Sequence, residues 1–410
     1  MKLKTIKFEN YKAFKSIQEF EIKPITILIG KNSSGKSVVS RLPLLISRSL
    51  AGSSSSPLEL QFDDLDFGGS FVDLIHNRFS HGFLNFEIVF ADSSSEAITL
   101  KVQIQNIADY PIQIIKFFSL TSSDGFKLEL NWILNEAINE PQFYEATGAL
   151  TGKHNIDFKG FIPVNIREPN FLKYLTRIKE VPQTINYLGP FRQFPERTYR
   201  YTGSTMPQIG YKGKNAPQIL GIDYFKDGKI VESVGEWFKE NLGGWKLGVE
   251  KALNFFELVL VSPDDPSVKV NIVDVGHGMS QVLPIIVRNF IPNGFNNSIE
   301  IVEQPELHLH PAAHGNLAEL YATTSQRENS SFIIETHSEN FILRLRRLVA
   351  EGKIKKEDII IYWIDDLQRP GSELNKIEVD DNGDVNFWPE GIFTESLEEV
   401  KGMRRAQREK

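Results

Sequence analysis

The sequence predicts an α/β protein that has a mixed or parallel core sheet and an inserted antiparallel β-rich lobe. Three observations support this fold class. An apolar strand at 25–29 runs into a glycine-rich loop and a helix, and strands alternate with helices from residue 268 onward. Between them, from about 58 to 164, short alternating segments are separated by polar turns, which is typical of an antiparallel meander.

Composition limits the function classes. The 410 residues carry 46 basic and 53 acidic side chains, which gives a net charge of −7. The overall charge therefore does not indicate nucleic-acid binding. There is no cysteine, which excludes disulfides, thiol nucleophiles and Cys-based metal sites. The longest apolar run, Ile359 to Ile364, is far shorter than the ~18–20 residues of a membrane helix. We expect a cytoplasmic protein with no membrane partner.

The loop after the first buried strand fits the pattern GxxxxGK[ST] and is expected to bind phosphate. Its glycines let backbone N–H groups turn inward as an anion nest. Lys36 is expected to reach the β- and γ-phosphates of ATP, and Ser37 to hold Mg²⁺. A P-loop NTPase is therefore predicted. The expected nucleotide-binding residues are Gly30, Lys31, Asn32, Ser33, Ser34, Gly35, Lys36 and Ser37.

The remaining elements follow in order. A helix is expected from about 36 to 50, followed by a flexible loop at 51–57. Meander strands are expected at 83–90, 97–105, 112–119 and 127–134. The stretch 165–260 is mixed, with strands at 184–191 and 255–261 and helices near 215–222 and 231–241.

A second acidic feature follows the buried run 298–302. Glu303 stands where a P-loop fold places its Mg²⁺-side carboxylate. Gln304, beside it, can orient water but cannot take a proton, so Glu306 is the nearest carboxylate that could substitute. The histidines at 308, 310 and 314 have a ligand-like spacing, but no further ligand completes a metal site.

Five motifs, in order, resemble the ABC-type ATPase heads of the SMC, RecF and OLD group. They are an opening F-x-N-[FY]-[KR]-x-F segment, the Walker A loop, a signature motif before a helix, an extended Walker B and D-loop, and a switch strand ending in a histidine. In this chain they occupy 8–14, 30–37, 274–281, 303–311 and 332–338.

The resemblance implies roles for further residues. Lys12 or Lys15 would face the nucleotide phosphates, Gly278 and Ser280 would belong to the signature, and His337 would be the switch histidine. The slot that usually holds the catalytic glutamate is Gln304 here, which implies slow hydrolysis, with Gln304, Glu306 and His337 as the catalytic candidates. The Q-loop residue would be Arg192 or Gln193.

The resemblance also implies an assembly and a domain plan. Two heads would pair head-to-tail, each signature capping the nucleotide of the other chain. The head would span 1–345 with a β-rich and helical insertion at about 58–260, and 346–410 would add closing strands and a basic tail. The segment 388–393 resembles stand-alone heads found beside an effector gene.

Three functions stay open from the sequence. The first is an ATPase whose dimerisation gates a separate effector, such as a nuclease, in antiphage defence. The second is a scaffold clamped by ATP with little hydrolysis. The third is a RecF-like repair ATPase that binds DNA, for which the sequence offers only small basic clusters at 344–347 and 404–405.

Overall fold

The computed structural model describes residues 1–62, 65–92, 96–107, 112–134, 142–203, 208–291, 297–365, 371–389, 392–393 and 395–408. The chain forms two compact units, each assembled from separate stretches of sequence. The first unit comprises Met1–Lys23, Lys31–Asn186 and Ile364–Asn375, and the second comprises Pro24–Gly30, Tyr187–Trp363 and Lys376–Lys410. The predicted boundaries at 58, 260 and 345 stay a prediction.

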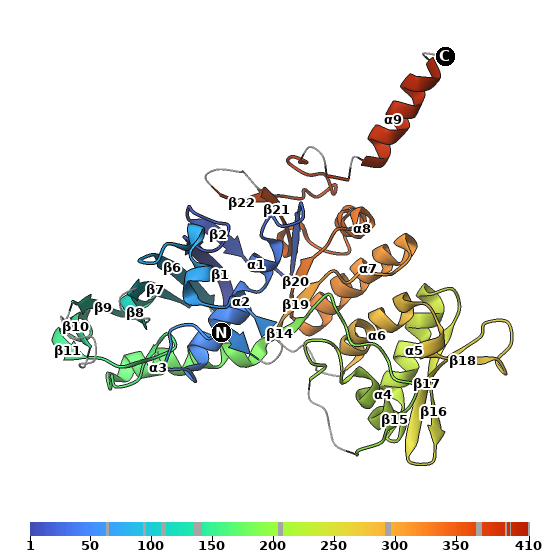
Figure 1. Cartoon of the computed structure of the whole chain (residues 1–410), viewed down its shortest axis with the longest axis horizontal. Coiled ribbons are helices and arrows are strands. Elements are labelled where there is room, and N and C mark those ends of the chain that lie inside the picture. Colours follow the sequence, from blue (N-terminus) through green and yellow to red (C-terminus); the bar gives the residue numbers. More distant parts are fainter. Residues whose placement is uncertain are drawn as a thin grey trace. The chain divides into compact units, whose positions relative to one another are not determined.

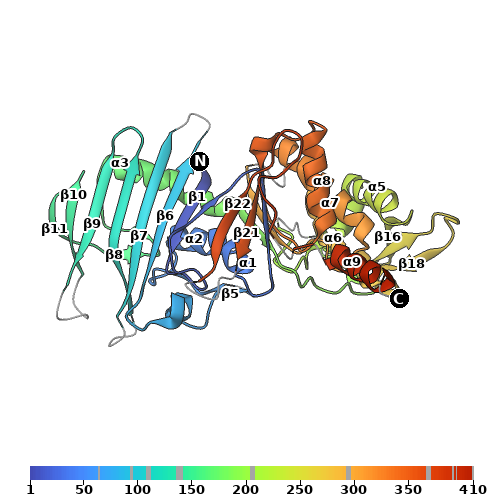
Figure 2. The same cartoon turned by 90° about the horizontal axis from the view of Figure 1, so that it is seen from above.

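The first unit is built on an eight-stranded sheet, which contains the predicted meander (Figure 2). The strand order is β11-β10-β9-β8-β7-β6-β1-β2. Its strands are β1 (Lys2–Glu9), β2 (Gln18–Glu21), β6 (Phe83–Ala91), β7 (Ala97–Ile107), β8 (Ile112–Ser122), β9 (Lys127–Ile133), β10 (Phe143–Gly148) and β11 (Gly152–Asn155). Every pairing is antiparallel, and burial alternates along β6 and β7 because successive side chains point to opposite faces.

The buried face of this sheet packs against α3 (Pro169–Lys179), where Phe171 meets Phe118 of β8. The predicted helix 36–50 is broken in the structure. It forms α1 (Lys36–Ser40) and α2 (Leu42–Ala51), which meet at Arg41. Pro43 lies in the first turn of α2, where a proline favours a new helix start over continuation of the previous one. Two short pairs, β4 (Gln61–Phe62) with β5 (Leu65–Asp66) and β12 (Phe158–Lys159) with β13 (Ile162–Pro163), complete the unit.

A six-stranded sheet has the order β14-β19-β20-β3-β21-β22 (Figure 1), and most of its residues belong to the second unit. Its strands are β3 (Ile25–Gly30), β14 (Ile185–Leu188), β19 (Ile299–Glu303), β20 (Ser331–Glu335), β21 (Ile359–Asp365) and β22 (Glu373–Ile377). β19, β20 and β3 are parallel neighbours. β3 and β19 are buried along their whole length, which explains the apolar run of β3, while the acids of β19 are buried with it.

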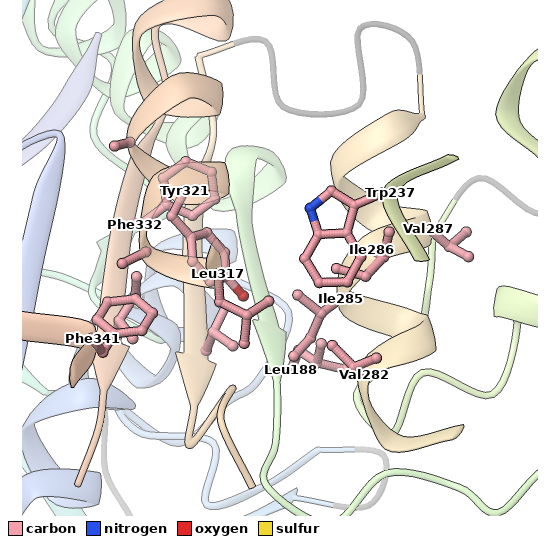
Figure 3. Close-up of a cluster of buried hydrophobic side chains, with 14 of the residues drawn as sticks. Leu188, Trp237, Val282, Ile285, Ile286, Val287, Leu317, Tyr321, Phe332 and Phe341 are labelled. Carbon is pink, nitrogen blue, oxygen red and sulfur yellow. The ribbon is translucent and has the colours of Figure 1, made fainter. Parts of the chain in front are cut away.

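Helices on one face of this sheet enclose a large hydrophobic cluster. It includes Ile285 and Ile286 of α6 (His277–Phe290) and Leu317 and Tyr321 of α7 (Pro311–Glu328), as Figure 3 shows. α8 (Glu339–Ala350) adds its own apolar side chains. The alternation of strands and helices predicted from 268 is therefore present, and it builds the parallel part of the sheet from β19 onward.

A smaller antiparallel sheet completes the second unit beside two helices. It contains β15 (Tyr199–Arg200), β16 (Lys246–Ala252), β17 (Phe255–Val261) and β18 (Lys269–Asn271). The first strand after residue 268, β18, pairs with β17 in this sheet and is not part of the parallel one. The helices are α4 (Ala216–Tyr224) and α5 (Lys229–Asn241), close to the predicted ranges.

The C-terminal segment forms a turn and then a helix. Val379 bridges Val385 around Gly383, whose φ of 77° suits glycine in a tight turn. The indole of Trp388 donates to the carbonyl oxygen of Ile392, while residues 390 and 391 of the 388–393 motif lie outside the described residues. The last element is α9 (Glu395–Arg408). In the described part of the chain, no helix combines the length and apolar character needed to cross a membrane.

A buried ion pair connects α6 to β19. The Arg288 guanidinium donates to both carboxylate oxygens of Glu300, at 2.7 and 3.2 Å, and the Ser298 hydroxyl donates to the same carboxylate. The two side chains are only 10% and 6% exposed, so solvent screens their charges weakly. Loss of one partner would leave the other charge buried and uncompensated.

Replacing Arg288 with Met is therefore expected to cost about 3–5 kcal/mol of unfolding free energy, because Glu300 stays buried without its cation. Urea unfolding of the purified chain measures this. Arg347→Met is the matched control, since the Arg347–Glu351 pair is 67% and 31% exposed and such pairs contribute about 0–1 kcal/mol. The double variant Arg288→Met/Glu300→Leu should recover most of the loss. Equal losses in Arg288→Met and Arg347→Met would contradict the assignment.

Candidate active site

The glycine-rich loop runs from Gly30, the last residue of β3, to Lys36, the first residue of α1. Gly35 has a φ of 109° and Ser33 one of 65°, so the backbone curls through left-handed conformations. The Lys36 ammonium is buried and donates to the Lys31 carbonyl oxygen at 2.7 Å, while Ser34 Oγ is buried without a hydrogen-bond partner. The loop thus encloses an ammonium and an unused hydroxyl, which fits an anion with several acceptor oxygens.

The predicted opening motif packs on this loop through Phe14. Gly35 has a φ of 109°, and a Cβ there would lie 3.0 Å from the Phe14 ring, so both the backbone and the ring favour glycine. Lys12 takes a φ of 53°, and its ammonium lies near Gly68 and within electrostatic reach of Asp73. Burial lowers the pKa of Lys12, and the Asp73 carboxylate opposes that shift. Contact of Lys12 with phosphate stays a prediction.

Two acids end adjacent parallel strands of the core sheet. Glu303 of β19 is in register with Glu335 of β20, and the side chains are 1% and 4% exposed. The sequence predicts Glu303 as the Mg²⁺-side carboxylate, which stays a prediction, and it gives no such indication for Glu335. Which strand lies beside which is a tertiary property, so the only available sequence signal was an acid at the end of an apolar run.

Gln304 follows Glu303 in a left-handed conformation with a φ of 45°, which is unusual for a residue other than glycine. Its N–H donates to the Glu335 carbonyl oxygen at 2.7 Å. The Arg192 guanidinium donates to the carbonyl oxygens of Glu303 and Gln304, at 2.9 and 3.2 Å. These bonds fix the backbone where the Walker B strand ends.

Of the two Q-loop candidates, Arg192 is buried and Gln193 is exposed. Burial lowers the pKa of Arg192 to about 10, against the opposing charges of Glu306 and Glu303, so it stays a cation at neutral pH. The Gln281 side chain of α6 donates to the Arg192 carbonyl oxygen. Arg192 therefore joins the signature helix to the acidic strand end.

Glu306 connects the D-loop to the switch segment. Its Oε1 accepts the backbone N–H of His337 at 2.7 Å, while Oε2 is buried without a hydrogen-bond partner. Burial raises the pKa of Glu306, and the hydrogen bond from the His337 N–H opposes the shift. The His337 side chain is exposed. The Glu306 carboxylate thus holds the backbone that presents the His337 ring.

The histidine cluster has structural roles. His310 Nδ1 accepts the Ala312 N–H and caps α7. The His314 ring lies 2.7 Å from Ser338 Oγ and 3.2 Å from the Leu309 carbonyl oxygen, so it is a second link between D-loop and switch. Among the described residues, no group of three His, Asp or Glu side chains is arranged to hold a metal ion.

The signature segment begins α6, with Gly276 as its N-cap. Ser280 is buried, and its hydroxyl donates to the His277 carbonyl oxygen. A Cβ at Gly278 would lie 2.4 Å from the His308 carbonyl oxygen, whereas one at Gly276 would meet nothing within 4 Å. Gly278 is therefore needed where the signature helix and the D-loop backbone approach each other.

These features define a class: a P-loop ATPase head of the ABC type, similar to those of the SMC and RecF group. The loop encloses the Lys36 ammonium and the Ser34 hydroxyl, which fits phosphate binding, while the Mg²⁺ roles of Ser37 and Glu303 stay predictions. A family model described as AAA ATPase domain matches residues 1–165 and 208–342. The chain belongs to this AAA ATPase family and is an ATP-binding ATPase.

Solved structures give further, more distant similarities. An SMC head domain from Thermotoga maritima is 13% identical, with a TM-score of 0.46, over 92% of this chain and 100% of that one. An Smc head domain with an extended coiled coil, bound to the C-terminal domain of ScpA and derived from Pyrococcus furiosus, is 12% identical, with a TM-score of 0.45, over 98% and 99%. Among curated proteins, no significant sequence match is found.

Gly278→Ala is expected to lower the unfolding free energy by about 1–3 kcal/mol, because the added methyl forces α6 or the D-loop backbone to shift. Thermal unfolding followed by circular dichroism measures the effect. Gly276→Ala is the control, and its melting temperature should stay at the wild-type value. Unchanged stability in both variants would show that the close approach at His308 is not a constraint.

Glu306→Gln is expected to raise the melting temperature at pH 8. Burial raises the pKa of this carboxyl above its ordinary 4.5, so folding costs free energy once the group is ionised. The cost is absent below the ordinary pKa and grows as pH rises through the folded-state pKa. The gap between variant and wild type should therefore close toward pH 4.

Melting curves from pH 4 to pH 8 test this, with Glu240→Gln, at an exposed position, as the control that should melt like wild type. A Glu306→Gln variant that is less stable at pH 8 would mean that the folded protein favours the ionised carboxylate.

Proposed function

We propose that the protein hydrolyses ATP between two copies paired head-to-tail, and that this cycle gates a separate effector in antiphage defence. The observation that carries the hydrolytic part is the double tether between D-loop and switch, through Glu306 and His314. A binding loop alone would need no such link. The effector is inferred from the resemblance of the 388–393 segment to stand-alone heads beside effector genes.

In this proposal the site residues have separate roles. The loop 30–37 binds the triphosphate, with Lys36 at the β- and γ-phosphates. Glu303 and Ser37 would hold Mg²⁺, which neutralises phosphate charge when bound. Gln304 and His337 would orient and polarise the attacking water, and Glu306 keeps the His337 backbone in place. Gly278 and Ser280 would face the nucleotide of the second copy.

The head-to-tail pairing would couple these groups across the dimer. The signature helix α6 reaches the acidic strand end through Gln281 and Arg192. A nucleotide held by the partner's loop against this helix would therefore act on the backbone of Gln304 through two side chains. A scaffold with little hydrolysis would form the same dimer, but it would not need the connection from α6 through Gln281 and Arg192 to Gln304.

DNA binding has less support from the structure. Arg344 donates to Glu319, Arg347 to Glu351, and Arg346 to the Gly383 carbonyl oxygen. These contacts neutralise or occupy the basic cluster of α8. Fewer cationic groups are then available for phosphate contacts, which dominate the affinity of DNA-binding proteins.

The test is steady-state ATP turnover by the purified chain. Lys36→Ala is expected to lower turnover at least ~100-fold, because it removes the ammonium that stabilises developing charge on the phosphates. The exposed Lys179→Ala is the matched control and should keep the wild-type rate. A wild-type rate no higher than that of Lys36→Ala, with ATP still bound, would overturn the hydrolase in favour of the ATP-clamped scaffold.

The assembly is tested by light scattering with and without ATP. Wild type should approach the mass of two chains with ATP, and Lys36→Ala should stay at one. A mass that does not change with ATP would contradict the nucleotide-dependent dimer, whatever the turnover.

A further inference from the structure

Glu335 is a buried acid to which the mechanism above gives no role. It ends β20 directly beside Glu303, the last residue of β19. Both side chains are almost fully buried, at 4% and 1% exposure. Residues in register on adjacent parallel strands point to the same face of the sheet, so the two carboxylates lie side by side.

The hydrophobic cluster shows which face this is. Val302 and Ile334, one residue earlier on each strand, pack in that cluster with side chains of α6 and α7. Glu303 and Glu335 therefore project from the opposite face, because successive strand residues alternate. Nothing in the hydrophobic core requires an acid there.

The register of β3 places Glu335 near the start of the phosphate loop. Glu335 is in register with Leu28, and the Thr336 N–H donates to the Leu28 carbonyl oxygen at 3.2 Å. Gly30, the first loop residue, lies two residues beyond Leu28 and thus on the same face. Glu335 therefore lies at the edge of the sheet where β3 ends and the phosphate loop begins.

Chemistry favours a catalytic task for this acid. Water attack on phosphate is helped by a group that can accept a proton, and the residue after the Walker B acid is the amide Gln304. Glu306, the other nearby carboxylate, holds the switch backbone through its Oε1, whereas Glu335 ends the strand that lies between β19 and β3.

We propose that Glu335 is the general base of ATP hydrolysis and takes the place of the missing glutamate at position 304. This assignment rests on the proposed ATPase function. The water oxygen forms a bond to the γ-phosphorus while the bond from that phosphorus to the β-phosphate oxygen breaks. The water proton passes to the Glu335 carboxylate and leaves with the phosphate or to solvent. Glu303 stays on the Mg²⁺ side, and Gln304 orients the water.

The test compares ATP affinity with turnover in Glu335→Gln, which keeps the size of the side chain and removes its basicity. We expect kcat to fall at least ~100-fold, within the range that general bases contribute. The Kd for ATP with Mg²⁺, measured by calorimetry, should stay within about threefold of wild type, and the ATP-bound dimer should persist in light scattering. Glu240→Gln is the control and should turn over like wild type.

A double variant that moves the carboxylate from position 335 to position 304 makes the test more specific. The double variant Glu335→Gln/Gln304→Glu places the base in the slot after Glu303 and should recover turnover at least tenfold over Glu335→Gln. A general loss of structure would not be repaired by this change. If Glu335→Gln melts below the assay temperature, Glu335→Asp keeps the charge but shortens the side chain, and should lower kcat without changing the Kd.

Three results would overturn the assignment. The first is wild-type turnover in Glu335→Gln. The second is a rise in the Kd for ATP with Mg²⁺ by the same factor as the loss of kcat, which would make Glu335 a metal ligand. The third is absence of Lys36-dependent turnover in wild type, which overturns the proposed hydrolase as well. The first two results leave the hydrolase standing and remove this base alone.

Discussion

The architecture of the second unit depends on how the backbone is held where β19 and β20 end. The Gln304 N–H donates to the Glu335 carbonyl oxygen, and Arg192 donates to the carbonyl oxygens of Glu303 and Gln304. A left-handed conformation at a residue other than glycine costs roughly 1–2 kcal/mol, and these hydrogen bonds offset it at Gln304. Without them the chain would leave the sheet in a different direction, and the D-loop would not meet the switch.

Arg192, which holds these two carbonyl oxygens, is a buried cation, and its burial affects the stability of the site. Burying a guanidinium is costly, as its lowered pKa shows, and its Nε has no hydrogen-bond partner. A neutral side chain could not hold two carbonyl oxygens and also offset the charges of Glu303 and Glu306. Because Gln281 contacts the same residue, displacement of α6 would be transmitted to the acidic strand end.

The sequence predicted features that rest on local patterns. The phosphate loop, the meander strands and the alternation that builds the parallel sheet each have a local signal, and the structure shows them where they were expected. Features that depend on pairing between distant segments were missed. The pairing of β18 with β17 and the adjacency of Glu303 and Glu335 are of this kind, whereas the break at Arg41 has a local signal, Pro43, which the prediction did not use. Periodicity indicates that a residue is buried, but it does not identify its neighbour.

The difference between local sequence patterns and strand pairing also matters for the position of a catalytic acid, which is better defined by its place in the sheet than by its place in the sequence. The predicted slot after Glu303 was found by counting along the chain, and there the structure has an amide with a strained backbone. Parallel strands bring residues that are 32 positions apart into register, so an acid from β20 reaches the same edge as one from β19. Position 304 must satisfy a left-handed turn and hydrogen bonds with Glu335 and Arg192, whereas position 335 is the last residue of a regular strand. A carboxylate placed at 335 is therefore fixed by the regular ladder itself, which is the more rigid support for a reacting group.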